Sequence, residues 1–189
     1  MPRNSDDARK NLTQAALELF AQNGFEQTTA AQIAARAGVT ERTFFRHFVD
    51  KREVLFDGQG LLGTALAEAI ENASTSLSPM EVLILAMEAV LPILEGNRRY
   101  SEPRQRIIAT TPALQEREAA KHAALTKIMS DALERRGTSS RRATLASHIA
   151  LGALAYALAS WFAEPDTSLE MHLGRAFAEM KELAAASSK

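Results

Sequence analysis

The sequence predicts an all-α protein, with an N-terminal three-helix, helix-turn-helix head followed by a helical-bundle body. Alanine and leucine dominate the chain, and apolar side chains recur at the three- and four-residue spacing of amphipathic helices. Alternating apolar and polar positions, which would indicate strands, are rare. Near the N-terminus, Gly38 lies between two short helical segments, as the tight turn of a helix-turn-helix requires.

Length and composition narrow the class of protein. The chain has 189 residues, of which 46% are hydrophobic and 24% charged, which is typical of a globular protein with a real core. This length suits a small head, expected over residues 1–50, and a larger body over residues 51–189. The chain has no cysteine, which excludes disulfides, thiolate catalysis and cysteine-bound zinc.

The sequence also bears on location and charge. The first ten residues are polar, and the longest apolar run, residues 149–163, is shorter than the roughly 20 residues of a membrane span. We therefore expect a cytoplasmic protein with no membrane partner. The net charge is -1, and residues 1–56 carry eight basic and seven acidic side chains. Any nucleic-acid binding must then depend on where the basic residues lie.

Three helices are expected in the head. Their segments are about 6–22, 29–37 and 40–49. Asn23-Gly24 ends the first helix, since glycine adopts the left-handed C-cap conformation easily. Thr29 and Gln32 have the spacing of a capping box, and Thr40 is a suitable N-cap for the third helix.

The body is predicted to be helical throughout. Caps, prolines and glycines divide it into helices over about 51–72, 78–96, 103–110, 112–136, 140–163 and 167–186. Ser78, Pro79 and Glu81 make a strong helix start, and Pro92 is expected to kink the helix that follows.

The third helix has two chemically different faces. Phe44 and Phe48 are four residues apart and are expected to point into the head's core. Arg42 and Arg46 then point away from the core, because each residue turns the helix by about 100°. The outward face is flanked by a hydroxyl and an aromatic ring, from Thr43 and Phe45. This pattern predicts a helix that reads DNA in the major groove.

The residue types suit that role. An arginine side chain can donate two parallel hydrogen bonds to guanine O6 and N7, which discriminates between bases by about 1–3 kcal/mol. An exposed Phe45 is expected to contact a thymine methyl or a sugar face. Lys51, Thr29 and Thr40 lie at helix starts, where cations, hydroxyls and free N–H groups suit phosphates. Arg3, Arg9 and Lys10 could add a basic arm.

The stretch TTAAQIAARAGVTERTFFRHFVDKREVLF, residues 28–56, resembles the signature of TetR-type repressors. The match covers about residues 12–56 and rests on Thr28-Thr29, Ile33-Ala34, Ala37-Gly38-Val39, Thr43, Phe45, His47-Phe48 and Asp50-Lys51, with Ala16, Leu19-Phe20 and Gly24-Phe25 upstream. The resemblance implies a nine-helix homodimer whose first three helices bind DNA. It also implies that the remaining helices bind a small effector and that the last two form the dimer interface.

Site residues follow from the same resemblance. Base contacts are expected from Arg42, Thr43 and Arg46, and phosphate contacts from Thr29, Phe45, His47 and Lys51. Two positions depart from the common pattern: Ala31 stands where many members carry a polar or charged residue. Phe45 replaces the commoner tyrosine, so no phenol is present to donate to a phosphate.

The body offers candidates for an effector pocket and a dimer surface. The pocket candidates are aromatic, basic or flexible apolar residues: Met87, Tyr100, Arg104, His122, His148, Tyr156, Trp161 and Phe162. The dimer candidates are apolar residues of the last two helices: Leu151, Leu154, Leu158, Leu169, Leu173, Phe177 and Met180. The alternative for the dimer candidates is that they form the core of a single chain.

Taken together, the patterns predict a transcription regulator of repressor type, which binds palindromic operator DNA as a homodimer and is released by a small-molecule effector. One alternative is a small-molecule binding protein whose head does not act on DNA. A helical-bundle enzyme is a second alternative, but no catalytic pair, phosphate loop or ligand cluster supports it. The four histidines lack metal-ligand spacing, so neither a metal nor a cofactor is expected.

Overall fold

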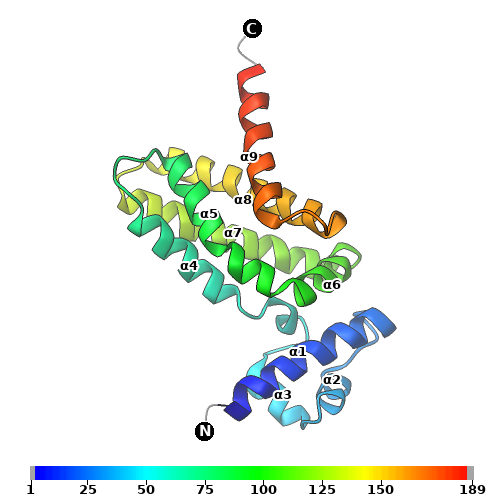
Figure 1. Ribbon diagram of the computed structural model, residues 1–189. Coiled ribbons are helices and arrows are strands. Elements are labelled where there is room, and N and C mark those ends of the chain that lie inside the picture. The colour runs from blue at the N-terminus through cyan, green and yellow to red at the C-terminus, as the bar shows by residue number, and fades with distance from the viewer. Residues whose placement is uncertain (1–2, 187–189) are drawn as a thin grey trace. The chain divides into compact units, whose positions relative to one another are not determined.

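The computed structural model describes residues 3–186, and this part of the chain contains nine α-helices, one 3-10 helix (η1) and no strand. The predicted all-α fold is confirmed. The chain forms two compact units, which Figure 1 draws with their helices labelled. We name them the head unit, with residues up to 59 and residues 97–119, and the body unit, with residues 60–96 and those from 120 onward.

The head unit is larger than the segment predicted from the sequence, because α6 packs against α1. It contains α1 (Arg3–Asn23), α2 (Ala30–Arg36), α3 (Glu41–His47), η1 (Glu53–Phe56), α6 (Arg98–Ala109) and the first turns of α7 (Pro112–Arg135). Its core combines Phe20, Ile33 and Phe44 of the first three helices with Ile108 and Leu114 from α6 and α7. Residues 97–119 therefore help to hold the helix-turn-helix.

The predicted caps of the head are confirmed. The Gln32 backbone N–H donates to Thr29 Oγ1 at 3.2 Å, and the Thr29 N–H donates to Gln32 Oε1 at 2.8 Å, which completes the capping box. Gly38 has φ +71°, in the left-handed region that favours glycine, and so allows the tight turn between α2 and α3.

One predicted helix, residues 51–72, is wrong at its start. The structure has η1, then Gly58 at φ +80°, and only then α4 (Gln59–Asn72). A left-handed residue cannot continue a right-handed helix, so the chain breaks at Gly58. The short helix expected over 103–110 also begins earlier, at Arg98, with Pro103 inside it.

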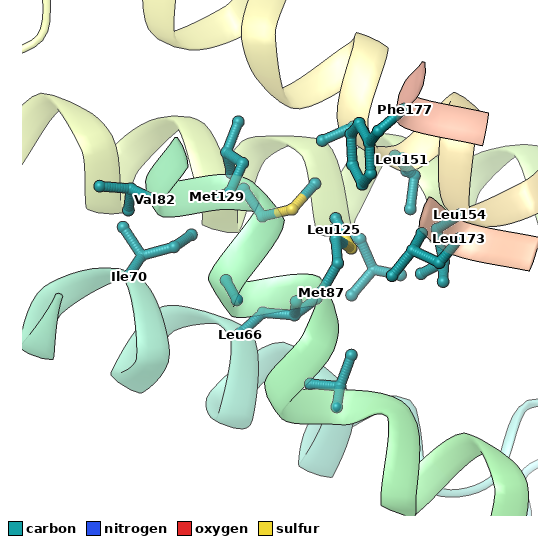
Figure 2. Packing of buried hydrophobic residues seen from close by; sticks show 14 of the residues in the cluster. Leu66, Ile70, Val82, Met87, Leu125, Met129, Leu151, Leu154, Leu173 and Phe177 are labelled. Atoms are coloured by element: carbon teal, nitrogen blue, oxygen red, sulfur yellow. The ribbon is translucent and has the colours of Figure 1, made fainter. Parts of the chain in front are cut away.

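The body unit packs five helices around one apolar core. Its elements are α4, α5 (Pro79–Gly96), the rest of α7, α8 (Ser140–Ala163) and α9 (Leu169–Ala186). Figure 2 shows Leu66 of α4, Met87 of α5 and Leu125 of α7 pointing toward the same interior. α4 approaches α7 closely at Gly63, where an added Cβ would lie 2.8 Å from Ile128 Cδ1.

The predicted dimer residues belong to this core, so that prediction is wrong in its choice of face. Leu151, Leu154, Leu173 and Phe177 are all buried within one chain, and Figure 2 shows them packed where α8 meets α9. Leu169 is likewise buried, and Leu158 and Met180 pack against the same cluster. These residues face inward because the two helices pack against each other in the single protomer.

α8 combines a core face with an apolar outer face. Among the described residues it is the one helix long and apolar enough to span a membrane by length and composition, and 33% of that segment is buried inside the protein. Ala150, Leu154 and Trp161 lie on its buried side. Leu145 and Tyr156 are 60% and 63% exposed on the other side. Helix α8 therefore has a second apolar surface that the described residues leave exposed.

Candidate nucleic-acid interface

The recognition helix α3 is held at its start and along its inner face. The Thr43 backbone N–H donates to Thr40 Oγ1 at 3.2 Å, which confirms Thr40 as the N-cap of α3. Phe44 is fully buried and Phe48 is 4% exposed, with their ring centroids 5.7 Å apart. Two phenylalanines thus fix the rotation of α3 about its axis, as the sequence predicts.

The outer face of α3 carries exposed arginines. Arg42 and Arg46 are both exposed, and within the described part of the chain neither has an acidic side chain at ion-pair distance. Thr43 is half-buried beside them, and its hydroxyl lies 3.0 Å from that of Thr40. The guanidinium groups are therefore available to an external acceptor such as a guanine edge or a phosphate.

Phe45 and His47 lie on the two flanks of this outer face. Phe45 is 52% exposed, and its ring meets the Phe44 ring edge-on at 5.3 Å and 83°. His47 is half-buried, with its ring centroid 6.4 Å from that of Phe48. Thr29, at the start of α2, is exposed. The structure therefore keeps Phe45 and Thr29 at the surface of the head unit, whereas Nε2 of His47 is buried.

Lys51 has a different place from the one predicted. Its Nζ donates to the backbone carbonyls of Phe25, Glu26 and Thr28 at 2.7, 3.3 and 2.9 Å. It also lies 4.3 Å from the centroid of the Phe25 ring. An ammonium has three donors, so none is left for the predicted phosphate contact. Lys51 instead fastens the loop between α1 and α2, by contacts to residues 23–26 positions away that local sequence does not signal.

The predicted basic arm is also partly used inside the head. Arg9 donates from Nε and Nη2 to the Asp57 carboxylate at 2.6 Å each, and its guanidinium lies 5.1 Å from the Phe48 ring centroid. This pair joins α1 to the segment after η1. Of the other two residues, Lys10 is exposed, and the side chain of Arg3 lies outside the described residues.

Asp50 forms the corner between α3 and η1. Its carboxylate accepts hydrogen bonds from the backbone N–H groups of Arg52 and Glu53, at 2.7 and 3.2 Å, and from the Arg52 guanidinium at 2.8 Å. Burial raises the pKa of Asp50, but the hydrogen bonds from Arg52 and Glu53 outweigh it and leave the pKa lowered. The corner is thus held by an ionised carboxylate.

A second arginine pair encloses Phe56 of η1. The guanidinium carbons of Arg104 and Arg117 lie 4.8 and 4.7 Å from the Phe56 ring centroid. Arg117 donates to Glu53 at 2.7 and 3.0 Å, and this hydrogen bonding raises the pKa of Arg117. Sequence reasoning did not find this cluster, because its members come from η1, α6 and α7.

Arg104 was predicted to bind an effector, and the structure gives it another role. It donates to the Leu55 carbonyl and to the Glu118 carboxylate, both within the head unit. Tyr100 also belongs to the head unit, where it packs against the apolar core. These two residues therefore belong to a different unit from the other effector candidates.

The other effector candidates are not gathered around one space. Met87 is fully buried and Trp161 is 5% exposed in the body core, with Phe162 beside Trp161 at 5.5 Å between ring centroids. Tyr156 points outward. His148 lines a shallow groove between α7 and α8, and His122 is half-buried on α7. A separate hollow of about 530 Å³ lies in the head unit, between the end of α1 and α6.

The described residues contain no group of three or more histidine, aspartate or glutamate side chains that could hold a metal ion. The charged clusters of the head instead pair acids with arginines, as at Glu53 and Glu118.

The sequence matches two family models. The model described as bacterial regulatory proteins, tetR family, matches residues 12–57, and the one described as the MftR C-terminal domain matches residues 77–185. The chain belongs to the TetR family. The resemblance predicted from the motif around Gly38 is confirmed.

Individual relatives agree with this assignment. TcmR of Streptomyces glaucescens, an HTH-type transcriptional regulator, is 40% identical over 83 residues, which are 44% of this chain and 37% of that protein. The match to TcmR thus spans little more than a third of its length. The transcriptional regulator MftR of Mycobacterium tuberculosis is 27% identical over 173 residues, which are 88% of this chain and 86% of MftR.

Solved structures of the TetR family share the fold. The SmeT–triclosan complex has a TM-score of 0.64 at 22% identity and covers 91% of this chain and 90% of that one. SmeT is the repressor of a multidrug efflux pump of Stenotrophomonas maltophilia. With the family match and the exposed face of α3, the chain is a DNA-binding transcriptional regulator.

Proposed function

We propose that this TetR-family protein is a cytoplasmic repressor that binds a palindromic operator as a homodimer and leaves it when a small effector binds the body unit. The observation that carries the proposal is the outer face of α3. Arg42 and Arg46 are exposed there without an acidic partner among the described residues, while Phe44 and Phe48 anchor the opposite face. A short helix held in this way can enter the major groove.

The individual contacts follow from the position of each group. Arg42 and Arg46 would read guanines, and Thr43 would contact a neighbouring base. Thr29, Thr40 and His47 lie at the ends of the short helices and would contact phosphates. Phe45 has no polar atom, so its contact with DNA is apolar. Lys51 acts as a positioning residue, because it fastens the loop that leads into α2.

The outer faces of α8 and α9 support a homodimer. Exposed large apolar side chains lie on these faces, at Leu145 and Tyr156 of α8 and at Met171 of α9. Between them are small exposed residues, including Gly152 and Gly174. Small side chains allow helices to approach closely, and an exposed apolar surface of this kind marks an interaction site. We assign the dimer to this face, opposite the leucines predicted from the sequence.

Light scattering tests the dimer assignment. Tyr156→Glu places a charge in the proposed interface and is expected to convert dimers to monomers at micromolar concentration. Glu164→Lys, an exposed change just beyond the end of α8, is the control and should leave the dimer intact. A Tyr156→Glu protein that stays dimeric would contradict this assignment.

We place the effector in the core of the body unit, where Met87 and Trp161 of the predicted set lie. Methionine side chains adapt easily to new neighbours, which suits a core that opens for a ligand. SmeT, which shares the fold, is in complex with triclosan. Trp161 is the single tryptophan of this chain, so its fluorescence reports binding directly.

Selection from random DNA tests the main proposal. The full chain should enrich a palindrome whose half-sites are about 34–36 Å apart, one helical turn, and its affinity should fall steeply as salt rises. A protein that enriches no sequence, yet shows changes in Trp161 fluorescence with small molecules, would instead be a binding protein with an idle head.

A further inference from the structure

Phe45 is unusual among the phenylalanines near α3. Phe44 and Phe48 are buried, whereas Phe45 is 52% exposed. The Phe45 ring packs edge-on against Phe44, with 5.3 Å between the ring centroids, and the rest of the ring is open to solvent. The ring is thus held in place, and its exposed part gains hydrophobic free energy only if a partner covers it.

We propose that Phe45 is a specificity-determining residue that recognises the C5-methyl group of a thymine beside the guanine contacted by Arg42. The inference rests on the proposed function, because it requires α3 to lie in the major groove. A phenyl ring cannot hydrogen-bond to a phosphate. The thymine methyl is the apolar group that base edges present in that groove, so it is the base feature that matches the ring.

The order of residues on α3 says where this thymine lies. At about 100° per residue, Phe45 is about 60° from Arg42 around the helix and about 160° from Thr43. Residues three apart on a helix surface are about 5–6 Å apart, and base pairs rise by about 3.4 Å. The thymine is therefore within about two base-pair steps of the guanine read by Arg42, on the side away from the base contacted by Thr43.

Contact with a deoxyribose face would cover the same ring but would carry no base preference. The two contacts differ in one measurable way, since only the thymine contact depends on a methyl group. Deoxyuridine pairs as thymidine does and lacks only that methyl. Replacing single thymines by deoxyuridine in the selected operator therefore separates the two sources of apolar contact.

The experiment measures operator affinity by fluorescence anisotropy with the full chain. At one thymine position, within about two base-pair steps of the guanine of Arg42, replacement by deoxyuridine in a single half-site should weaken binding about fourfold, the factor for one buried methyl-sized group. In Phe45→Ala the same replacement should change affinity less than twofold. Phe45→Leu keeps an apolar side chain and should retain part of the effect. Because Phe45 is half exposed, all three proteins should unfold at similar temperatures.

Two results would overturn the inference while leaving the proposed function intact. One is an operator that the protein binds equally well with deoxyuridine at every thymine. The other is an equal loss in Phe45→Ala, which would assign the methyl to another residue. Failure to enrich any DNA sequence would instead remove the proposed function and this inference with it.

Discussion

Two pairs of arginines in the head unit show how one residue type takes opposite roles. Arg42 and Arg46 on α3 are exposed and have no acidic partner among the described residues. The side chains of Arg104 and Arg117 are only 16% and 28% exposed, bond to Glu118 and Glu53, and enclose Phe56. An arginine thus stays exposed where no neighbouring element presents a carboxylate, and forms an ion pair within the protein where one does.

Arg46→Ala, which removes one of the two exposed arginines, should have the largest effect on operator binding. We expect operator affinity to fall at least tenfold and the base preference to relax at one position per half-site, because each half-site loses a contact of about 1–3 kcal/mol. The unfolding temperature should not change. Anisotropy titrations and a repeated selection measure both effects. Arg106→Ala, which removes an exposed arginine of α6 in the same unit, is the control and should bind as the parent does.

Arg104→Met should show the converse behaviour. Removing the guanidinium leaves the Glu118 carboxylate and the Leu55 carbonyl without their donor in a part-buried site. We expect the free energy of unfolding to fall by about 2 kcal/mol, measured by urea denaturation. The base preference selected from random DNA should stay the same. A changed preference with unchanged stability would show that Arg104 acts on DNA rather than on the fold.

Lys51→Met tests whether Lys51, a cation close to α3, stabilises the fold as Arg104 and Arg117 do. Its three carbonyl contacts predict a loss of about 1.5 kcal/mol in unfolding free energy. The slope of log affinity against log salt should remain unchanged, since no phosphate contact is removed. A slope smaller by about one, with normal stability, would restore the phosphate contact predicted from the sequence.

Arg36→Ala should have the smallest effect on stability, because Arg36 forms an ion pair that is exposed to solvent. Arg36 donates to Glu18 at 3.1 Å, with both side chains about 40% exposed. Exposed pairs contribute little, so the unfolding free energy should change by less than about 0.5 kcal/mol. Denaturation at low and high salt measures this. A loss of more than about 1 kcal/mol in unfolding free energy would show that Arg36 stabilises the fold as Arg104 and Arg117 do.

The local features of the head were predictable from the sequence. Thr29, Thr40 and Gly38 mark helix starts and a turn within a few residues of themselves, so their roles can be read without the fold. The spacing of Phe44 and Phe48 likewise predicted which face of α3 is buried. These predictions hold because helix capping and helix rotation depend on residues at most four positions apart.

The tertiary structure decided the features that depend on distant partners. Lys51 meets a carbonyl 26 residues away, Arg104 one 49 residues away, and Arg117 a carboxylate 64 residues away. For Leu151 and Phe177 the apolar pattern predicted burial but could not say whether the chain's own core or a second copy covers them. The sequence by itself determined most of the helices, the caps of the head and which face of α3 is exposed. Only the packing of helices determined which cations and which leucines were already used inside the protomer, because a side chain's partner is set by contacts that local sequence does not encode.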